Sequence, residues 1–183
     1  RLLTFANGGA PVTRPDSLVA VAREAAARCL RGSAVTCVFH EAPALPLVAL
    51  DHGQMSQVFT NLFANAVDAM PEGGQIEVDA SCVDVGEETL PPLAAGRYVR
   101  VAVTDHGVGI SPDVVERVFD PYFTTKDRGR GLGLATVHSI VKRHGGHVEA
   151  RCEPARTSFV VHLPATTSGE SGEGAGDEPQ PLA

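Results

Sequence analysis

The chain has 183 residues, of which 43% are hydrophobic, and this composition predicts one packed core with room for tails. The formal net charge of -7, from 15 basic and 22 acidic residues, argues against a broad surface for nucleic acid. No run of about 18 apolar residues is present, so we expect no membrane-spanning helix and no direct membrane contact.

The N-terminal part of the chain predicts two helices with a strand between them. We assign residues 1–10 to the end of a longer helix, since a glycine pair closes the pattern. Asp16 is placed to cap the next helix, and alternating side chains predict a strand over 35–39. Asp51 begins the strongest helix, whose apolar residues recur at three- and four-residue steps and form one stripe: Met55, Val58, Phe59, Leu62, Phe63, Ala66 and Val67.

The C-terminal part of the chain is richer in strands. In order, we predict strands over 76–82 and 99–103, a short helix capped by Ser111, a polar segment over 120–130 that could act as a lid, a helix over 132–144, and strands over 147–152 and 157–163. Residues 165–183 are rich in Gly, Ser, Glu and Pro, which predicts a disordered acidic tail and leaves 11–164 as the domain. This order of elements favours an α+β fold, a two-layer α/β sandwich with a mixed, mostly antiparallel sheet covered by helices on one face.

Cysteine usage indicates the compartment. The four cysteines are scattered along the chain with no Cys-x-x-C pair, so a zinc site is not expected: Cys29, Cys37, Cys82 and Cys152. Buried free thiols are typical of a reducing compartment, and we therefore expect a cytoplasmic location.

A first polar cluster lies on the strongest helix. Asn61, Asn65 and Asp68 are spaced by four and three residues, so they share one helix face beside the apolar stripe. Amide oxygens suit Mg²⁺, which prefers hard oxygen ligands shared with water and phosphate. The alternative is that both asparagines are buried amides with hydrogen-bond partners inside the protein.

A second cluster follows a predicted strand directly. Asp105 stands at the strand end and is followed by a loop with Gly107, Gly109 and Ile110. A carboxylate in this place can accept a hydrogen bond from an exocyclic amine such as that of adenine, and glycines let the backbone approach a flat ligand. The alternative is an ordinary glycine turn.

A third cluster combines aromatic and basic residues. Phe119 and Phe123 are four residues apart, and Lys126 follows after two hydroxyl residues. The aromatic rings can anchor a lid to the core while the lysine reaches a phosphate as a point charge. The alternative is a pair of core aromatics beside a solvated lysine.

A fourth cluster is glycine-rich and opens the helix over 132–144. Gly131, Leu132 and Gly133 leave N–H groups and the positive end of the helix dipole exposed to an anion such as phosphate. The pattern is neither a Walker A loop nor a dinucleotide fingerprint, because the required spacing and the preceding strand are missing. The alternative is a glycine-rich helix start without a ligand.

These four clusters, in this order, resemble the N box, the first glycine box, the F box and the second glycine box of the ATP-binding domain of sensor histidine kinases. That domain belongs to the ATPase superfamily of gyrase, the heat-shock chaperones and the mismatch-repair ATPases, and its architecture is the Bergerat fold. The likeness covers most of residues 51–163. The stretch from Gly131 to His138 is especially similar to sensor kinases of the nitrogen-regulation type.

The resemblance implies that ATP and Mg²⁺ are the cofactors. It implies that Asn65 binds the metal, that Asp105 holds the adenine amine, and that Asn61 and Lys126 act in catalysis close to the phosphates. Thr157 is similar to a threonine that supports the aspartate in the family, although Arg156 stands where the family usually has glycine. The residues that the resemblance places around the nucleotide are Asn61, Asn65, Asp68, Asp105, Gly107, Gly109, Ile110, Lys126, Gly131, Leu132, Gly133 and Thr157.

One departure separates kinases from hydrolases. Superfamily members that hydrolyse ATP carry a glutamate one helical turn before the metal-binding asparagine, where it acts as general base. Here that position is Asn61, an amide that cannot take a proton. The substitution favours a histidine kinase domain and opposes the first alternative, a water-activating ATPase. The second alternative is a degenerate docking module, which the intact Asp105, Asn65 and glycines oppose.

The phosphoacceptor is expected outside this chain. His40, followed by Glu41, superficially resembles an acceptor, but it ends a strand pattern, whereas an acceptor lies mid-helix. The resemblance implies a separate dimerisation and phosphoacceptor hairpin located before Arg1, and a response regulator downstream. We therefore expect this chain to supply the phosphoryl donor and to show negligible autophosphorylation alone.

Overall fold

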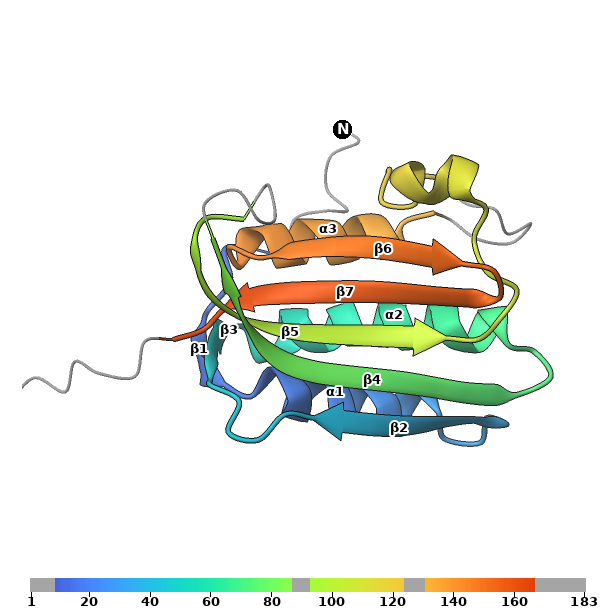
Figure 1. Cartoon of the computed structure of the whole chain (residues 1–183), viewed down its shortest axis with the longest axis horizontal. Coiled ribbons are helices and arrows are strands. Elements are labelled where there is room, and N and C mark those ends of the chain that lie inside the picture. Colours follow the sequence, from blue (N-terminus) through green and yellow to red (C-terminus); the bar gives the residue numbers. More distant parts are fainter. Residues whose placement is uncertain (1–8, 87–92, 124–130, 167–183) are drawn as a thin grey trace, which may run out of the picture.

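Within residues 9–86, 93–123 and 131–166, which the computed structural model describes, the chain forms a five-stranded sheet, a two-stranded sheet and three α-helices (Figure 1). The three α-helices lie behind the large sheet in this view, so the protein has two layers. In chain order the elements are β1 (Arg14–Asp16), α1 (Leu18–Cys29), β2 (Val35–Glu41), β3 (Val48–Leu50), α2 (His52–Ala69), β4 (Gly74–Val85), β5 (Gly96–Asp105), the 3-10 helix η1 (Pro112–Arg117), α3 (Gly133–Arg143), β6 (His147–Glu153) and β7 (Arg156–Pro164).

The large sheet has the strand order β2-β4-β5-β7-β6. Its one parallel pair is β2 with β4, and the chain between them passes through α2, as a parallel connection requires. The pairs β4–β5, β5–β7 and β6–β7 are antiparallel. The predicted fold class, a two-layer sandwich with a mixed, mostly antiparallel sheet covered on one face, is therefore confirmed.

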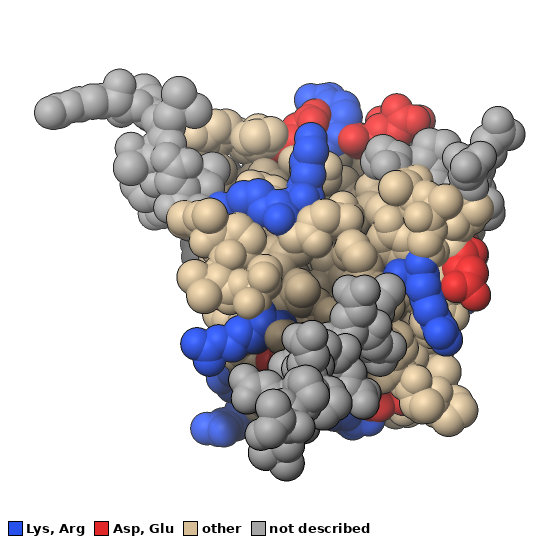
Figure 2. Space-filling view, turned by 90° about the vertical axis from the view of Figure 1, so that its left-hand side faces the viewer, with Lys and Arg blue, Asp and Glu red and all other residues tan. Residues whose placement is uncertain are grey.

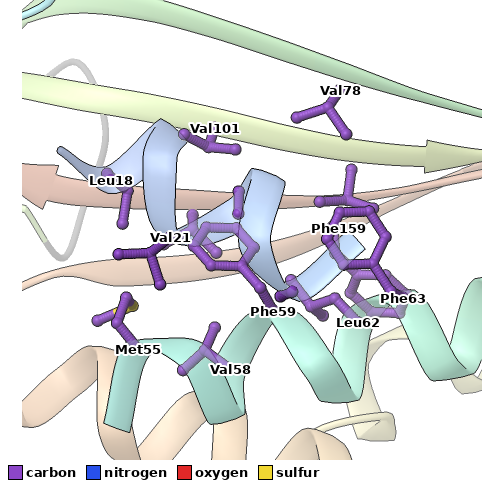
Figure 3. Packing of buried hydrophobic residues seen from close by; sticks show 14 of the residues in the cluster. Leu18, Val21, Met55, Val58, Phe59, Leu62, Phe63, Val78, Val101 and Phe159 are labelled. Atoms are coloured by element: carbon purple, nitrogen blue, oxygen red, sulfur yellow. The ribbon is translucent and has the colours of Figure 1, made fainter. Parts of the chain in front are cut away.

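The core lies between α2 and the sheet. The predicted stripe of α2 is buried, with Phe59 and Phe63 completely inaccessible, and its last member Val67 is partly buried. Figure 3 shows these rings directed toward residues of the sheet such as Val101 and Phe159. Burial of each ring stabilises the fold by roughly 1.5–3 kcal/mol. Because side chains alternate along a strand, the residues between these core positions face away from the helices.

Three local features differ from the sequence expectations. The short strands β1 and β3 pair antiparallel, and neither was predicted. Each has three residues, too few for a visible alternation. The cap of α1 is Ser17, whose side chain accepts a hydrogen bond from the backbone of Ala20, whereas Asp16 binds the N–H of Ser17. Ser111 precedes a 3-10 helix and makes no side-chain capping bond.

The ends of the described chain are held to the domain. Ala165 and Thr166, which the sequence assigned to the tail, donate backbone hydrogen bonds to Arg97 and Leu47. Residues 1–8 and 167–183, and with them most of the two predicted terminal segments, lie outside the described residues. None of the helices within the described ranges has the length and apolarity needed to cross a bilayer.

Candidate functional site

The C-terminal half of α2 carries the first predicted cluster. Asn61 and Asn65 are partly buried and Asp68 is exposed, so the triplet runs from the interior to the surface. The side-chain amide of Asn61 donates a hydrogen bond to the backbone oxygen of Gly133, with an N···O distance of 3.2 Å. The structure therefore brings the first cluster against the fourth, at the first turn of α3.

Asp105 ends β5 on the side of the sheet that faces the helices. Its carboxyl group is buried, and Oδ1 accepts a hydrogen bond from the backbone of Gly107 at 3.0 Å. In the sheet register Asp105 lies opposite Thr157 of β7, which is also buried, and Thr157 lies opposite Cys152 of β6. Two buried polar groups thus stand side by side at this end of the sheet, with a thiol next to them.

Thr157 reaches this place although Arg156, and not a glycine, precedes it. Glu153 pairs with Arg156, so the hairpin between β6 and β7 has the two-residue turn of Pro154 and Ala155. Ala155 takes up the left-handed conformation that a glycine would otherwise provide, with φ of 58°. The short turn preserves the register between Thr157 and Asp105.

The loop after Asp105 is packed directly against the end of α2. A Cβ atom at Gly107 would lie 2.4 Å from the backbone oxygen of Ala69, so only glycine fits this contact. The next residue, Val108, donates its N–H to the same oxygen at 3.2 Å. Gly109 has φ of 75°, and Ile110 packs against the core. The loop is therefore held between α2 and the strand end.

The start of α3 is fixed by the first residues of the predicted lid. Gly131 has φ of 62°, and its carbonyl accepts a hydrogen bond from the N–H of Tyr122 at 2.9 Å. A Cβ atom at Gly131 would lie 2.5 Å from the carbonyl oxygen of Phe123. Leu132 caps α3 without a side-chain hydrogen bond, so the first N–H groups of this helix are not capped by their own cap residue.

Aromatic contacts anchor the same segment to the core. Phe119 packs edge-on against Phe159 of β7, with ring centroids 6.2 Å apart, and lies 5.8 Å from the ring of His138 in α3. The guanidinium of Arg117 lies 4.7 Å from the centre of the Phe123 ring. Lys126, together with the rest of 124–130, lies outside the described residues.

The described residues of the four clusters therefore lie toward one end of the helical layer, at the right of Figure 1, where β5 ends and α3 begins. Sequence reasoning missed Cys152 as a neighbour of this site. The alternation of Val148, Ala150 and Cys152 places the thiol on the helix-facing side, and this signal could have found it. Burial, and then the negative charge of Asp105, raise the pKa of the Cys152 thiol.

A separate hollow lies on the opposite face of the sheet. It has a volume of about 180 Å³ and is polar, with strand residues that alternate with those of the core. Because the sheet separates this hollow from Asp105, it is not part of the candidate site. Its lining residues are Asp79, Arg100, Ala102, Thr104, Arg151, Glu153, Arg156, Ser158 and Val160.

The chain is similar in sequence and in structure to known proteins. The chain is 39% identical to the sensor histidine kinase ZraS of Escherichia coli O157:H7 over 131 residues, which cover 71% of this chain and 26% of ZraS. It is 34% identical to the sensory histidine kinase/phosphatase NtrB of Rhizobium meliloti over 157 residues, covering 82% of this chain and 39% of NtrB. The structure of full-length ShkA in complex with AMPPNP superposes with a TM-score of 0.72 at 26% identity, covering 90% of this chain and 33% of ShkA.

The chain thus spans between a quarter and two fifths of the length of these two curated relatives. The sequence family described as "Histidine kinase-, DNA gyrase B-, and HSP90-like ATPase" matches residues 50–167, which include all four clusters. The chain belongs to this family, and it is an ATP-binding catalytic domain of the type found in two-component sensor histidine kinases.

Proposed function

We propose that this domain holds Mg-ATP at the end of the helical layer and donates the γ-phosphoryl group to a histidine on a separate helical hairpin. The observation that supports this most directly is the pair of buried polar groups, Asp105 and Thr157, beside the loop that Gly107 holds against α2. A buried carboxylate needs hydrogen-bond donors, and the exocyclic amine of adenine is one. ShkA, a structural neighbour, binds AMPPNP.

The donor set fits Mg²⁺ shared with phosphate oxygens. Asn65 offers an amide oxygen on a partly buried helix face, and Asp68 follows within one turn. The start of α3 offers N–H groups and the positive end of the helix dipole to the phosphates, with Gly133 exposed there. Lys126 is proposed as a further phosphate contact, on the resemblance alone. The metal would neutralise charge on the transferring phosphoryl group.

The chemistry at Asn61 favours phosphoryl transfer to a protein over hydrolysis. Its amide nitrogen donates to the carbonyl oxygen of Gly133 at 3.2 Å, a contact that a carboxylate could not make. The side chain is thus used to hold α2 and α3 together, and it cannot take a proton from water. We therefore propose a positioning role for Asn61, and negligible release of inorganic phosphate.

We also propose that the phosphoacceptor, the response regulator and the cytoplasmic setting are those of sensor kinases. His40, the one residue with a superficially acceptor-like neighbour, lies on strand β2 rather than mid-helix. Phosphoryl transfer needs mainly a positioned acceptor, so the hairpin supplied in trans should be sufficient. The four free cysteines suit a reducing cytoplasm.

Calorimetric titration of Mg-ATP into the wild type and into Asp105→Asn tests the site. A hydrogen bond to a charged group contributes about 1.5–3 kcal/mol, so the variant should bind roughly 10- to 150-fold more weakly. Asp79→Asn, which makes the same chemical change on the opposite face of the sheet, is the matched control and should bind normally. Absence of wild-type binding at millimolar nucleotide would favour the docking module, and steady phosphate release would favour a water-activating ATPase.

A further inference from the structure

The ends of α2 and α3 that lie far from the candidate site are joined by a buried histidine. The backbone N–H of Asp51, the cap of α2, donates to Nε2 of His144 at 3.0 Å. Since Nε2 accepts, Nδ1 carries the ring proton and donates to the carbonyl of Ile140 in α3 at 2.8 Å. His144 is 8% exposed, so this contact is shielded from water.

The middle of α2 is also joined to α3, at the first residue of α3. Asn61 of α2 donates to Gly133 at the start of α3, beside the proposed phosphate site. The two helices run antiparallel and contact each other, and the two ties join the start of α2 to the end of α3 and the middle of α2 to the start of α3. A helix rises 1.5 Å per residue, so the two ties lie on the order of 15 Å apart.

The N-terminal segment, residues 9–12, is hydrogen-bonded onto the far tie. The carbonyl of Gly9 accepts from Nε2 of Gln54 in α2 at 3.1 Å and from Nη1 of Arg143 in α3 at 3.3 Å. The N–H of Val12 donates to Oδ2 of Asp51 at 3.0 Å, while Oδ1 of the same carboxylate accepts from the N–H of Gln54 at 3.0 Å. One backbone carbonyl thus bridges both helices, and one carboxylate holds both the helix cap and the segment.

The ionisation of Asp51 favours the same hydrogen bonds between residues 9–12 and the helix ends. The backbone donors at Gln54 and then Val12 hold the pKa of Asp51 below its usual value, so both carboxylate oxygens are acceptors at neutral pH. Figure 2 views the molecule from the end that carries β1 and β3, and there Lys and Arg side chains are interspersed with Asp and Glu side chains around uncharged residues. The segment is therefore held by specific hydrogen bonds rather than by a broad patch of one charge.

We propose that the N-terminal segment and the nucleotide site are energetically coupled through the tied pair of α2 and α3, with Asp51 as a positioning residue for the nucleotide site. The two states differ in whether the segment is bound to the helix ends or released into water. Nucleotide and the bound segment both stabilise the paired arrangement of the two helices, so each should strengthen the binding of the other. The inference rests on the proposed function, since it needs a nucleotide at the Asn61 end.

Asp51→Asn separates the two roles of this carboxylate. Asparagine is as good a helix cap as aspartate, so its amide oxygen keeps the bond from the N–H of Gln54. Its amide nitrogen replaces Oδ2 and faces the N–H of Val12, where two donors meet and no hydrogen bond forms. The variant therefore releases the segment while the helix start is preserved. Asp51→Ala removes both contacts and reports the cost of the lost cap.

Gln54→Met gives an independent second variant. It removes the side-chain donor to Gly9 and keeps the length of the side chain and the backbone N–H that binds Asp51. Oε1 of Gln54 is buried without a hydrogen-bond partner among the described residues, so its loss removes no other contact. Both variants should act in the same direction if the segment is coupled to the site.

The test measures Mg-ATP affinity by calorimetry and amide hydrogen exchange in the whole 183-residue chain. Asp51→Asn should speed exchange of the Val12 amide, leave that of Gln54 protected, and weaken Mg-ATP binding by about fivefold or more. In the wild type, Mg-ATP should slow exchange at Val12, because coupling is reciprocal. Unchanged affinity in both variants, or Val12 exchange insensitive to nucleotide, would overturn the coupling. Failure of the wild type to bind nucleotide is a different result, which would overturn the proposed function as well.

Discussion

Replacement of Gly107 by alanine tests the packing on which the candidate site depends. The new Cβ atom would lie 2.4 Å from the backbone oxygen of Ala69 and 2.7 Å from its carbonyl carbon, and both are backbone atoms that cannot rotate away. Ordinary contact needs about 3.4 Å, so the loop and the end of α2 must separate by about 1 Å. The hydrogen bond from Val108 to the same oxygen, already 3.2 Å long, would then be lost.

The expected cost can be worked out from these two effects. Overpacking costs about 1–3 kcal/mol and the lost hydrogen bond about 1 kcal/mol, so the free energy of unfolding should fall by roughly 2–4 kcal/mol. For a chain of this size that corresponds to a Tm lower by on the order of 5–15 °C. Thermal unfolding followed by circular dichroism measures the shift, and Mg-ATP binding should weaken in the same variant because the loop moves away from Asp105.

Gly53→Ala is the matched control, since it adds the same methyl group to the first turn of α2, the helix whose other end contacts Gly107. Its Cβ atom would meet only Oδ1 of Asp51, at an ordinary contact distance of 3.5 Å. Alanine in place of glycine in a helix gains about 0.5–1 kcal/mol, so Tm should rise slightly. If Gly107→Ala melted and bound nucleotide like the wild type, the close approach of the loop to α2 would be unimportant and the reasoning wrong.

Two further predictions use titration and thiol chemistry. Burial lowers the pKa of His162 from 6.5 to about 4, with nearby Arg100 opposing protonation and Glu149 favouring it, so the folded protein keeps this ring neutral while the unfolded chain takes up a proton. The free energy of unfolding should therefore fall as the pH drops from about 6.5 to 4. In His162→Val, the difference in this free energy between pH 7 and pH 4.5 should be smaller by about 2 kcal/mol, as measured by urea unfolding. A pH dependence like that of the wild type would contradict this. Mg-ATP should slow alkylation of Cys152 by N-ethylmaleimide, because the thiol lies next to Thr157 beside the proposed adenine site. Alkylation of Cys29, which lies on α1, should not change. Mass spectrometry of the labelled peptides measures both rates, and equal slowing of the two thiols would refute a local effect.

Local patterns in the sequence account for much of the fold. The stripe of α2 and its cap at Asp51 could be read directly, because a helix of 18 residues repeats its period several times. The same holds for the central parts of β4 and β5, where the apolar residues alternate over 76–82 and 99–103. The helix-on-one-face arrangement followed from the order of these elements.

The features that sequence reasoning missed depend on contacts between distant residues. β1 and β3 are short and pair across more than thirty positions, so neither strand carries a pattern of its own. Asp51 was predicted as a helix cap, but its bonds to Val12, 39 residues away, and to His144, 93 residues away, have no local signal. The alternation along β6 indicates the face on which Cys152 lies, but only the register of β6 and β7 places it beside Thr157.

The antiparallel arrangement of α2 and α3 has an electrostatic consequence at the candidate site. The positive pole of α3 and the negative pole of α2 lie at the same end of the molecule, and the fields of the two helices largely cancel at long range. Close to the protein they do not cancel. The N–H of Val108 binds the carbonyl oxygen of Ala69 and so offsets part of the negative pole, whereas the cap residue Leu132 makes no side-chain hydrogen bond to the N–H groups of α3. An anion close to the start of α3 therefore meets the positive pole of this helix more directly than the negative pole of α2.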